Sequence, residues 1–174
     1  MRIIAGRWRG HRLKAVRGRS VRPTTDRVRE AWMSAIGDRL RGARVLDLFA
    51  GSGALGLEAL SRGAESVVLV ERSRGALRVI EANVDQLGAR DETRIVADDV
   101  FRFLKRVEEP YDIALADPPY GDGSASRLVE RFVEAPFAHE LWLEHPVREE
   151  LQLPPGAKTR RYGDTALSRL QVDE

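Results

Sequence analysis

The ten residues from Asp47 to Gly56, which read DLFAGSGALG, constrain the fold of this chain more than any other stretch. They overlap the apolar run 45–49, which is typical of a buried strand, and they lead into a helical pattern at 54–61. A glycine-rich turn between a strand and a helix opens a βαβ unit, whose next strand lies parallel to the first. This stretch therefore predicts an α/β fold built on a parallel sheet.

Strand and helix patterns continue to alternate along the chain. We predict further strands at 66–70, 94–97, 112–116 and 140–144, and helices at 74–86, 101–107 and 124–134. Because each parallel crossover needs a covering helix, the alternation indicates a doubly wound, mostly parallel sheet. The tail at 158–172 holds two short strand patterns around Tyr162-Gly163-Asp164, which predicts a final antiparallel hairpin.

The first forty residues follow a different pattern. Residues 3–14 contain two glycine-marked turns and predict a short hairpin, and 17–22 predict a loop. A helix then starts after Pro23, with a threonine as its cap. Its apolar residues recur at helical spacing, and we assign Trp32 among them to the core: Val28, Ala31, Trp32, Ala35, Ile36, Leu40.

Charge is distributed unevenly. Residues 1–30 contain ten Lys or Arg and two acidic residues, a net charge of +8, whereas the other 144 residues carry −6. A basic arm on an acidic body indicates a polyanionic partner that meets one end of the molecule. An arginine-rich composition typical of a heat-adapted or GC-rich organism is an alternative that remains open.

Several classes of site are excluded by composition. The chain has no cysteine, so it has no disulfide, no thiolate metal site and no cysteine nucleophile, and we predict no metal. It has no run of about 18 apolar residues and no apolar N-terminal stretch like that of a signal peptide. We therefore predict a cytoplasmic protein that contacts no membrane.

Acidic residues lie at the carboxyl ends of four predicted strands. Asp47 lies on the first strand, and Glu71, Asp99 and Asp117 follow the next three. Ligands of doubly wound sheets bind outside these strand ends, near the point where the strand order reverses. The four carboxylates thus predict one ligand site at this edge of the sheet.

Two cofactors are compatible with the glycine loop. Gly51, Gly53 and Gly56 satisfy G-x-G-x-x-G, and Glu71 lies twenty residues after Gly51, as in dinucleotide-binding proteins. However, the Asp47 carboxylate would repel a diphosphate, whereas it suits the sulfonium and ammonium charges of S-adenosylmethionine. No Tyr-x-x-x-Lys pair or suitably placed histidine is present for hydride transfer.

We therefore favour S-adenosylmethionine, with S-adenosylhomocysteine as product. Glu71 would accept from the ribose hydroxyls, and Asp99, in preference to Asp98, would accept from the adenine amino group. The predicted donor-site residues are Asp47, Phe49, Gly51, Gly53, Glu71, Asp99 and Val100.

The tetrapeptide Asp117-Pro118-Pro119-Tyr120 indicates the reaction. An exocyclic amine of a nucleobase is a poor nucleophile, because its lone pair is delocalised into the ring. Acceptors aimed at its N–H bonds, here the Asp117 carboxylate and the Pro118 carbonyl, favour a pyramidal nitrogen and stabilise the charge that develops on it. Consecutive prolines restrict the backbone, and Tyr120 offers a face on which an extruded base can stack. Whether Asp117 removes a proton or only orients the amine stays open.

The chain resembles the RsmD-type bacterial methyltransferases of small-subunit ribosomal RNA. DPPY and the glycine loop are shared by many amino-methyltransferases, whereas the segment 22–30 is more specific to this family. The similarity extends over nearly the whole sequence and is carried by RIIAG at 2–6, RPTTDRVRE at 22–30, the stretch 45–64, ADPPY at 116–120 and RYGDT at 161–165.

This resemblance implies a Rossmann-like class I methyltransferase fold with an added N-terminal hairpin and a reversed final strand. It implies methyl transfer from S-adenosylmethionine to guanine N2 of 16S RNA, in assembled or partly assembled small subunits, by a protein that we expect to be monomeric. It also implies a basic N-terminal unit at 1–22 that grips RNA and a methyltransferase domain at 23–174. The predicted RNA contacts are Arg7, Trp8, Arg9, Arg12 and Lys14.

The segment between Tyr120 and the strand at Leu141 departs from the family pattern, because Ala135-Pro136-Phe137 replaces a longer, glycine-containing approach. We therefore predict no ligand contacts for that region from the family resemblance. Three other functions stay open: an adenine-N6 or cytosine-N4 methyltransferase acting on DNA, an NAD-dependent enzyme, and a non-catalytic RNA-binding protein. The chain lacks a separate DNA-recognition domain, and the intact DPPY argues against lost catalysis.

Overall fold

The structure is a computed structural model that describes residues 1–17 and 26–173. Within these residues helices and strands alternate after a first, mostly irregular segment. In chain order the elements are α1 (Asp26–Ile36), the 3₁₀ helix η1 (Gly37–Leu40), β1 (Arg44–Leu48), α2 (Ala54–Ser61), β2 (Ser66–Glu71), α3 (Arg74–Leu87), η2 (Arg90–Glu92), β3 (Thr93–Ala97), α4 (Val100–Leu104), β4 (Tyr111–Ala116), α5 (Ser124–Glu134), β5 (Ala138–Pro146), β6 (Lys158–Tyr162) and β7 (Thr165–Gln171).

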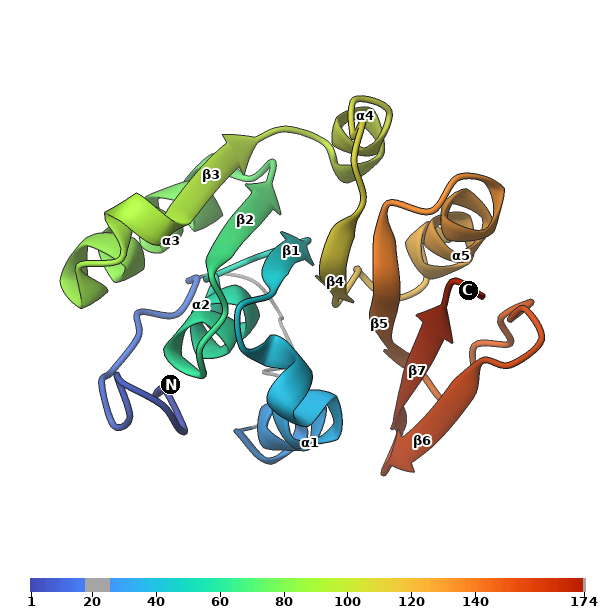
Figure 1. Ribbon diagram of the computed structural model, residues 1–174, viewed down its shortest axis with the longest axis horizontal. Coiled ribbons are helices and arrows are strands. Elements are labelled where there is room, and N and C mark those ends of the chain that lie inside the picture. The colour runs from blue at the N-terminus through green and yellow to red at the C-terminus, as the bar shows by residue number, and fades with distance from the viewer. Residues whose placement is uncertain (18–25, 174) are drawn as a thin grey trace.

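One sheet of seven strands forms the centre of the molecule, in the order β3-β2-β1-β4-β5-β7-β6 (Figure 1). The first five strands in this order are parallel, and β7 runs antiparallel to both β5 and β6. The strand order reverses between β1 and β4. The predicted class I methyltransferase fold, with its reversed final strand, is confirmed.

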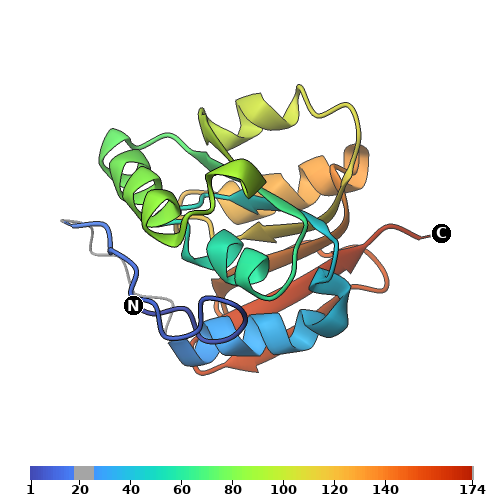
Figure 2. The ribbon, with the colours of Figure 1, turned by 60° about the vertical axis from the view of Figure 1, so that its left-hand side comes forward.

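Helices cover both faces of the sheet (Figure 2). On one face α1, α2 and α3 bury a cluster that includes Trp32, Leu57 and Ile80, and this confirms the assignment of Trp32 to the core. On the other face α4 and α5 bury a second cluster that includes Phe103 and Leu128. A sheet buried on both faces explains why its strands read as continuous apolar runs.

Most predicted elements are present with small shifts at their ends. The helices at 54–61 and 124–134 have the predicted bounds, whereas the helix predicted at 101–107 spans only Val100–Leu104. Beyond Leu104 the chain makes tighter turns, with the N–H of Arg106 donating to the carbonyl of Phe103. The strand predicted at 140–144 is longer, because β5 continues along β7 as far as Pro146.

The N-terminal segment folds back on itself as predicted, but it forms a single bridge, between Arg2 and Arg12, instead of two strands. The N–H of Ile3 donates to the carbonyl of His11 at 3.0 Å. Ile3 and Leu13 are buried in the same core as Trp32, so this segment packs onto the sheet domain. The predicted threonine cap, most of the predicted loop and the boundary at 22/23 lie outside the described residues, and the division into two units stays a prediction.

No helix in the part of the chain that the structure describes is long and apolar enough to cross a membrane.

Candidate active site

The carboxyl ends of four neighbouring strands form the edge of the sheet where the predicted site residues lie. Leu48 of β1 is in register with Val70 of β2 on one side and with Ala116 of β4 on the other. Glu71, at the end of β2, is in register with Ala97 at the end of β3. The glycine loop after β1 therefore lies between the ends of β2 and β4, directly beside the DPPY tetrapeptide.

Asp47 is a buried carboxylate behind the glycine loop. Only 1% of the residue is exposed, and its Oδ2 accepts from the N–H of Gly56 at 2.9 Å. Burial raises the pKa of Asp47 from 3.8 to about 8; the Gly56 hydrogen bond opposes this rise, and the charges of Asp117 and Glu71 add to it. Asp47 thus holds the loop onto α2 and has a proton that a nearby positive charge would displace.

Glu71 fixes the other side of the same loop. Its Oε2 accepts from the N–H of Gly51 at 2.8 Å, and its Oε1 accepts from the N–H groups of Arg72 and Ser73, both at 2.9 Å. A carboxylate offers about four lone pairs, so one lone pair of Oε2 is left for a ligand. This geometry is compatible with the predicted role in ribose binding.

The loop glycines serve different purposes. Gly51 has a φ of +58° and faces open space, so a ligand can lie against the backbone there. At Gly56 a Cβ would lie 2.4 Å from Leu69 Cδ2 and 2.8 Å from Val67 Cγ2. Gly56 therefore allows α2 to pack closely on β2, whereas Gly51 lines the candidate ligand site.

Phe49 is the only non-glycine residue with a positive φ, +58°, among those that the structure describes. This strained conformation ends β1 one residue earlier than predicted and turns the chain into the loop. The Phe49 ring packs edge-on against Phe101, with centroids 6.2 Å apart, and the Arg127 guanidinium lies 3.9 Å from the Phe101 centroid. Phe49 is thereby held at the base of the loop.

The two aspartates after β3 are in different environments. Asp98 is nearly buried and pairs with Arg106 at 2.6 Å and with Arg102 at 3.5 Å, so its charge is neutralised. Asp99 caps α4, accepting from the N–H of Arg102 at 3.0 Å; its side chain is 37% exposed and lies 3.8 Å from the exposed Arg72 guanidinium. Asp99 is therefore the more available acceptor, while Val100 after it is buried in the core.

The DPPY tetrapeptide follows β4 and reaches the C-terminal hairpin. Asp117 and Tyr120 are half-buried, Pro118 is buried and Pro119 is exposed. The Tyr120 hydroxyl lies 3.4 Å from Oγ1 of Thr165, the first residue of β7. This contact joins two motifs that are 45 residues apart in the sequence, DPPY and YGDT.

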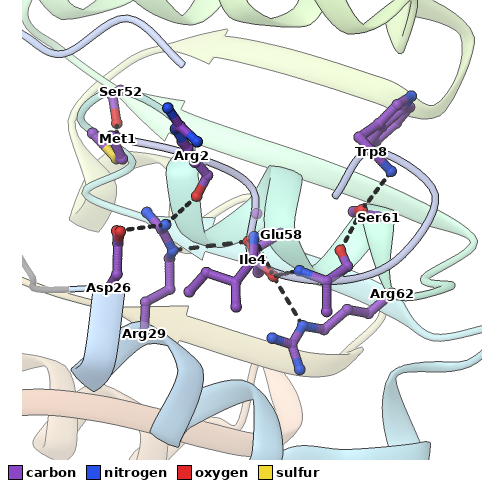
Figure 3. Close-up of polar contacts among 12 residues, drawn as sticks. Met1, Arg2, Ile4, Trp8, Asp26, Arg29, Ser52, Glu58, Ser61 and Arg62 are labelled. Carbon is purple, nitrogen blue, oxygen red and sulfur yellow. Dashed lines mark hydrogen bonds and ion pairs between the residues drawn. The ribbon is translucent and has the colours of Figure 1, made fainter. Parts of the chain in front are cut away.

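A second set of buried polar residues holds the N-terminal segment (Figure 3). Glu58 of α2 is completely buried and accepts from the N–H of Ile4 at 2.9 Å and of Ala5 at 3.1 Å. Two cations face its carboxylate: Arg62 Nε at 3.0 Å and the buried Arg29 Nε at 3.8 Å. Arg29 also donates to the carbonyl of Arg2. The segment is therefore tied to both α1 and α2.

Asn83 links this segment to the glycine loop. The Asn83 side chain is buried; its Nδ2 donates to the carbonyls of Lys14 at 3.0 Å and Ser52 at 2.9 Å, and its Oδ1 accepts from the N–H of Lys14 at 2.8 Å. Ser52 lies in the loop itself, and its hydroxyl is 3.9 Å from the sulfur of Met1 (Figure 3). The two ends of this segment, at Met1 and Lys14, therefore lie close to the candidate site.

The predicted RNA-binding residues are spread along this segment. Trp8 is half-buried against the core, and its backbone N–H donates to the Ser61 hydroxyl. Ser61 is the last residue of α2 and lies about 12 Å along the helix from the glycine loop. Arg7 covers the Trp8 ring at 3.9 Å and pairs with Glu92 at 2.7 Å. These contacts show that Trp8 pins the segment to the body. The side chains of Arg9, Arg12 and Lys14 are exposed.

Sequence reasoning missed Arg29, Glu58 and Asn83. Glu58 carried a usable signal, because it is the only charged residue in the apolar helix 54–61. Arg29 and Asn83 carried no sequence signal of burial, since a polar residue in an amphipathic helix is normally exposed. Their burial depends on the N-terminal segment, which covers them.

Comparison with known proteins gives consistent matches. The family described as Conserved hypothetical protein 95 matches residues 1–168. The Bacillus subtilis (strain 168) protein named "Putative rRNA methyltransferase YlbH" is 36% identical over 178 residues, covering 99% of this chain and 93% of that protein. Ribosomal RNA small subunit methyltransferase D of Escherichia coli (strain K12) is 42% identical over 123 residues, which cover 71% of this chain and 62% of that protein.

A solved structure matches over the whole fold. The structure described as "Putative methyltransferase yhhF from Escherichia coli" has a TM-score of 0.86 and 33% sequence identity, and the alignment covers 98% of this chain and 97% of that one. The shared fold thus includes the N-terminal segment and the C-terminal hairpin.

Proposed function

The chain belongs to the Conserved hypothetical protein 95 family, the RsmD-type methyltransferases, and from this premise we propose that it methylates the exocyclic N2 of a guanine in small-subunit ribosomal RNA, with S-adenosylmethionine as donor. The observation that carries the proposal is the pairing of β1 with β4, because it brings the glycine loop and DPPY together at one edge of the sheet. A donor held by the loop and a base held by the tetrapeptide would then be neighbours.

The residues of the loop fit S-adenosylmethionine. Gly51 faces open space, Glu71 keeps an acceptor for a ribose hydroxyl, and Asp99 remains available to the adenine amino group. Neither Asp47 nor Glu71 forms an ion pair with any residue in the described ranges. A positively charged ligand would therefore be favoured by the Glu71 carboxylate and by Asp47 once it has released its proton. When bound, the donor supplies an electrophilic methyl group on a positively charged sulfur.

The chain's own residues would prepare the amine. In this proposal the Asp117 carboxylate and the Pro118 carbonyl accept hydrogen bonds from the two N–H groups of the guanine amino group. This frees the lone pair of the amino nitrogen for attack. Tyr120 stacks on the base, and its contact with Thr165 restrains the ring. The proton leaves the product nitrogen either to Asp117 or to solvent.

Methyl transfer to purified small ribosomal subunits that lack this modification tests the proposal. With labelled S-adenosylmethionine and mass spectrometry of the nucleosides, we expect N2-methylguanosine. Label in N6-methyladenosine or N4-methylcytidine would keep the chemistry but overturn the substrate. Binding of NAD without binding of S-adenosylmethionine would overturn the reaction class.

A further inference from the structure

The C-terminal hairpin carries cations that the proposed catalytic residues leave unexplained. Lys158, Arg160 and Arg161 lie on β6, the last strand of the sheet, and all three are exposed. None of them forms an ion pair with a residue in the described ranges. Asp164 is the only acidic residue from 158 to 164. This edge is therefore positively charged on a body that is acidic overall.

Some cations elsewhere on the sheet domain are neutralised by acidic residues. Arg169, opposite Lys158 on β7, pairs with Glu140 at 2.8 Å, and Arg106 pairs with Asp98 at 2.6 Å. A surface pair gains little stability, yet it removes a positive charge from the field that an approaching polyanion meets. The β6 cations, which have no such partner in the described ranges, contribute their full positive charge to this field.

The hairpin also lies next to the proposed base site. Tyr162 pairs with Thr165, whose hydroxyl is 3.4 Å from the Tyr120 hydroxyl. Arg161 and Arg160 are the next residues along β6, so at about 3.4 Å per residue their Cα atoms lie within about 10 Å of Thr165. A nucleic-acid strand that presents a base to Tyr120 would have its neighbouring phosphates within reach of these guanidinium groups.

The two arginines point to opposite faces of the sheet, because side chains alternate along a strand. Arg160 is on the face of Leu167, its register partner, and Arg161 is on the other face. A ligand lying on one face would meet only one of them. A phosphate backbone that follows the edge itself would meet both, together with the outward N–H groups of the unpaired edge of β6.

We propose that the edge of β6, through Arg160 and Arg161, is an RNA-binding surface that holds the phosphates next to the target base, in addition to the N-terminal segment. The proposal rests on the proposed function for the identity of the RNA. It separates two roles: the N-terminal segment contacts RNA from the side of α2, and β6 contacts it from the side of Tyr120.

The test compares two double variants that each remove two exposed charges. One is Arg160→Ala with Arg161→Ala; the control is Arg44→Ala with Lys105→Ala, two exposed cations away from Tyr120 that also form no ion pair with a residue in the described ranges. Binding of a fluorescently labelled RNA stem-loop and of purified small subunits is measured over a series of salt concentrations. For the β6 variant we expect several-fold weaker binding and a log–log salt slope smaller by about 1.4–1.8, that is about 0.7–0.9 per lost phosphate contact. The control should show a much smaller change.

A second pair of substitutions, Arg160→Lys with Arg161→Lys, should largely restore binding, because both charges remain. Equal loss in the β6 variant and the control would overturn the proposal. So would self-association of the β6 variant with unchanged RNA affinity, since the cations would then only protect an edge strand from pairing. The assay needs no methyl transfer, so failure of the proposed reaction leaves its result readable.

Discussion

Buried carboxylates hold backbone N–H groups in two regions of this molecule, at the edge of the sheet and under the N-terminal segment. At the sheet edge Asp47 and Glu71 hold the glycine loop, and no residue in the described ranges pairs with either as a cation. Under the N-terminal segment Glu58 holds Ile4 and Ala5, and it faces both Arg29 and Arg62. The same hydrogen-bonding device thus occurs in two different electrostatic settings.

The difference indicates which region is built for a ligand. Glu58 is neutralised by the protein itself, so its site is closed and serves packing. At the sheet edge several acidic residues lie close together. Burial, and to a smaller extent the charges of Asp117 and Glu71, raise the pKa of Asp47 to about 8. A positively charged ligand would relieve this repulsion. We therefore interpret the sheet edge as the functional region and the Glu58 cluster as its support.

The largest effect is expected at the sheet edge. Asp117→Asn keeps the shape of the side chain but removes the charge that would face the amine. We expect methyl transfer to fall by about 10²–10³-fold or more, with donor affinity nearly unchanged. Single-turnover kinetics and calorimetric donor binding measure the two quantities. Activity comparable to that of the unmodified protein would refute the assignment of the base site.

The support region should respond in stability instead. Glu58→Ala leaves the buried Arg29 with Asp26, at 2.9 Å, as its remaining acidic partner, and it frees two backbone N–H groups. We expect the free energy of unfolding, from urea titration, to fall by about 3–5 kcal/mol. A double variant with Glu58→Met and Arg29→Met removes both charges and should recover part of this loss. If Glu58→Ala changed stability by no more than an exposed Glu130→Ala control, the cluster would not anchor the segment.

Asn83 offers a way to sharpen the comparison, because it contacts both regions. Asn83→Ala leaves the N–H and carbonyl of Lys14 and the carbonyl of Ser52 without this buried partner, at an expected cost of about 2–3 kcal/mol. We also expect weaker donor binding, since Ser52 belongs to the loop. Gln86→Ala is the matched control: Gln86 donates at 2.8 Å to the carbonyl of Arg12 but does not contact the loop. Equal donor affinity in both variants would contradict the link.

The smallest effect is a change in pH dependence. The pKa of Asp47 is about 8 in the folded protein and near 3.8 when unfolded, so the folded state keeps a proton that the unfolded state releases between these values. Asp47 therefore stabilises the fold fully below pH 3.8, and this contribution is lost as pH rises through about 8. Asp47→Asn should flatten that decline in urea titrations from acid to alkaline pH. An unchanged slope would show that Asp47 titrates normally.

The sheet edge could be predicted from the sequence, whereas the support region could not. Glycine spacing, strand-terminal acids and DPPY are local patterns, and parallel topology alone brings them together. The environment of Arg29 and Asn83 depends on a segment that packs from outside the regular pattern. The contacts of Trp8 with Arg7 and Ser61 could likewise not be predicted from the sequence, and base stacking by Trp8 stays a prediction. The chain turn at Phe49 also escaped prediction, since nothing local favours a positive φ in phenylalanine.

The central claim is that unpaired negative charge at the sheet edge selects a positively charged donor. Calorimetry at a pH above 8, where Asp47 is ionised, compares S-adenosylmethionine, which carries a positively charged sulfonium, with the product S-adenosylhomocysteine, which lacks that charge. We predict that Asp47→Asn lowers the ratio of their affinities, whereas Glu58→Gln, which removes a negative charge from the support region, leaves it unchanged. The same ratio in the unmodified protein and in Asp47→Asn, or an equal drop in both variants, would contradict the account.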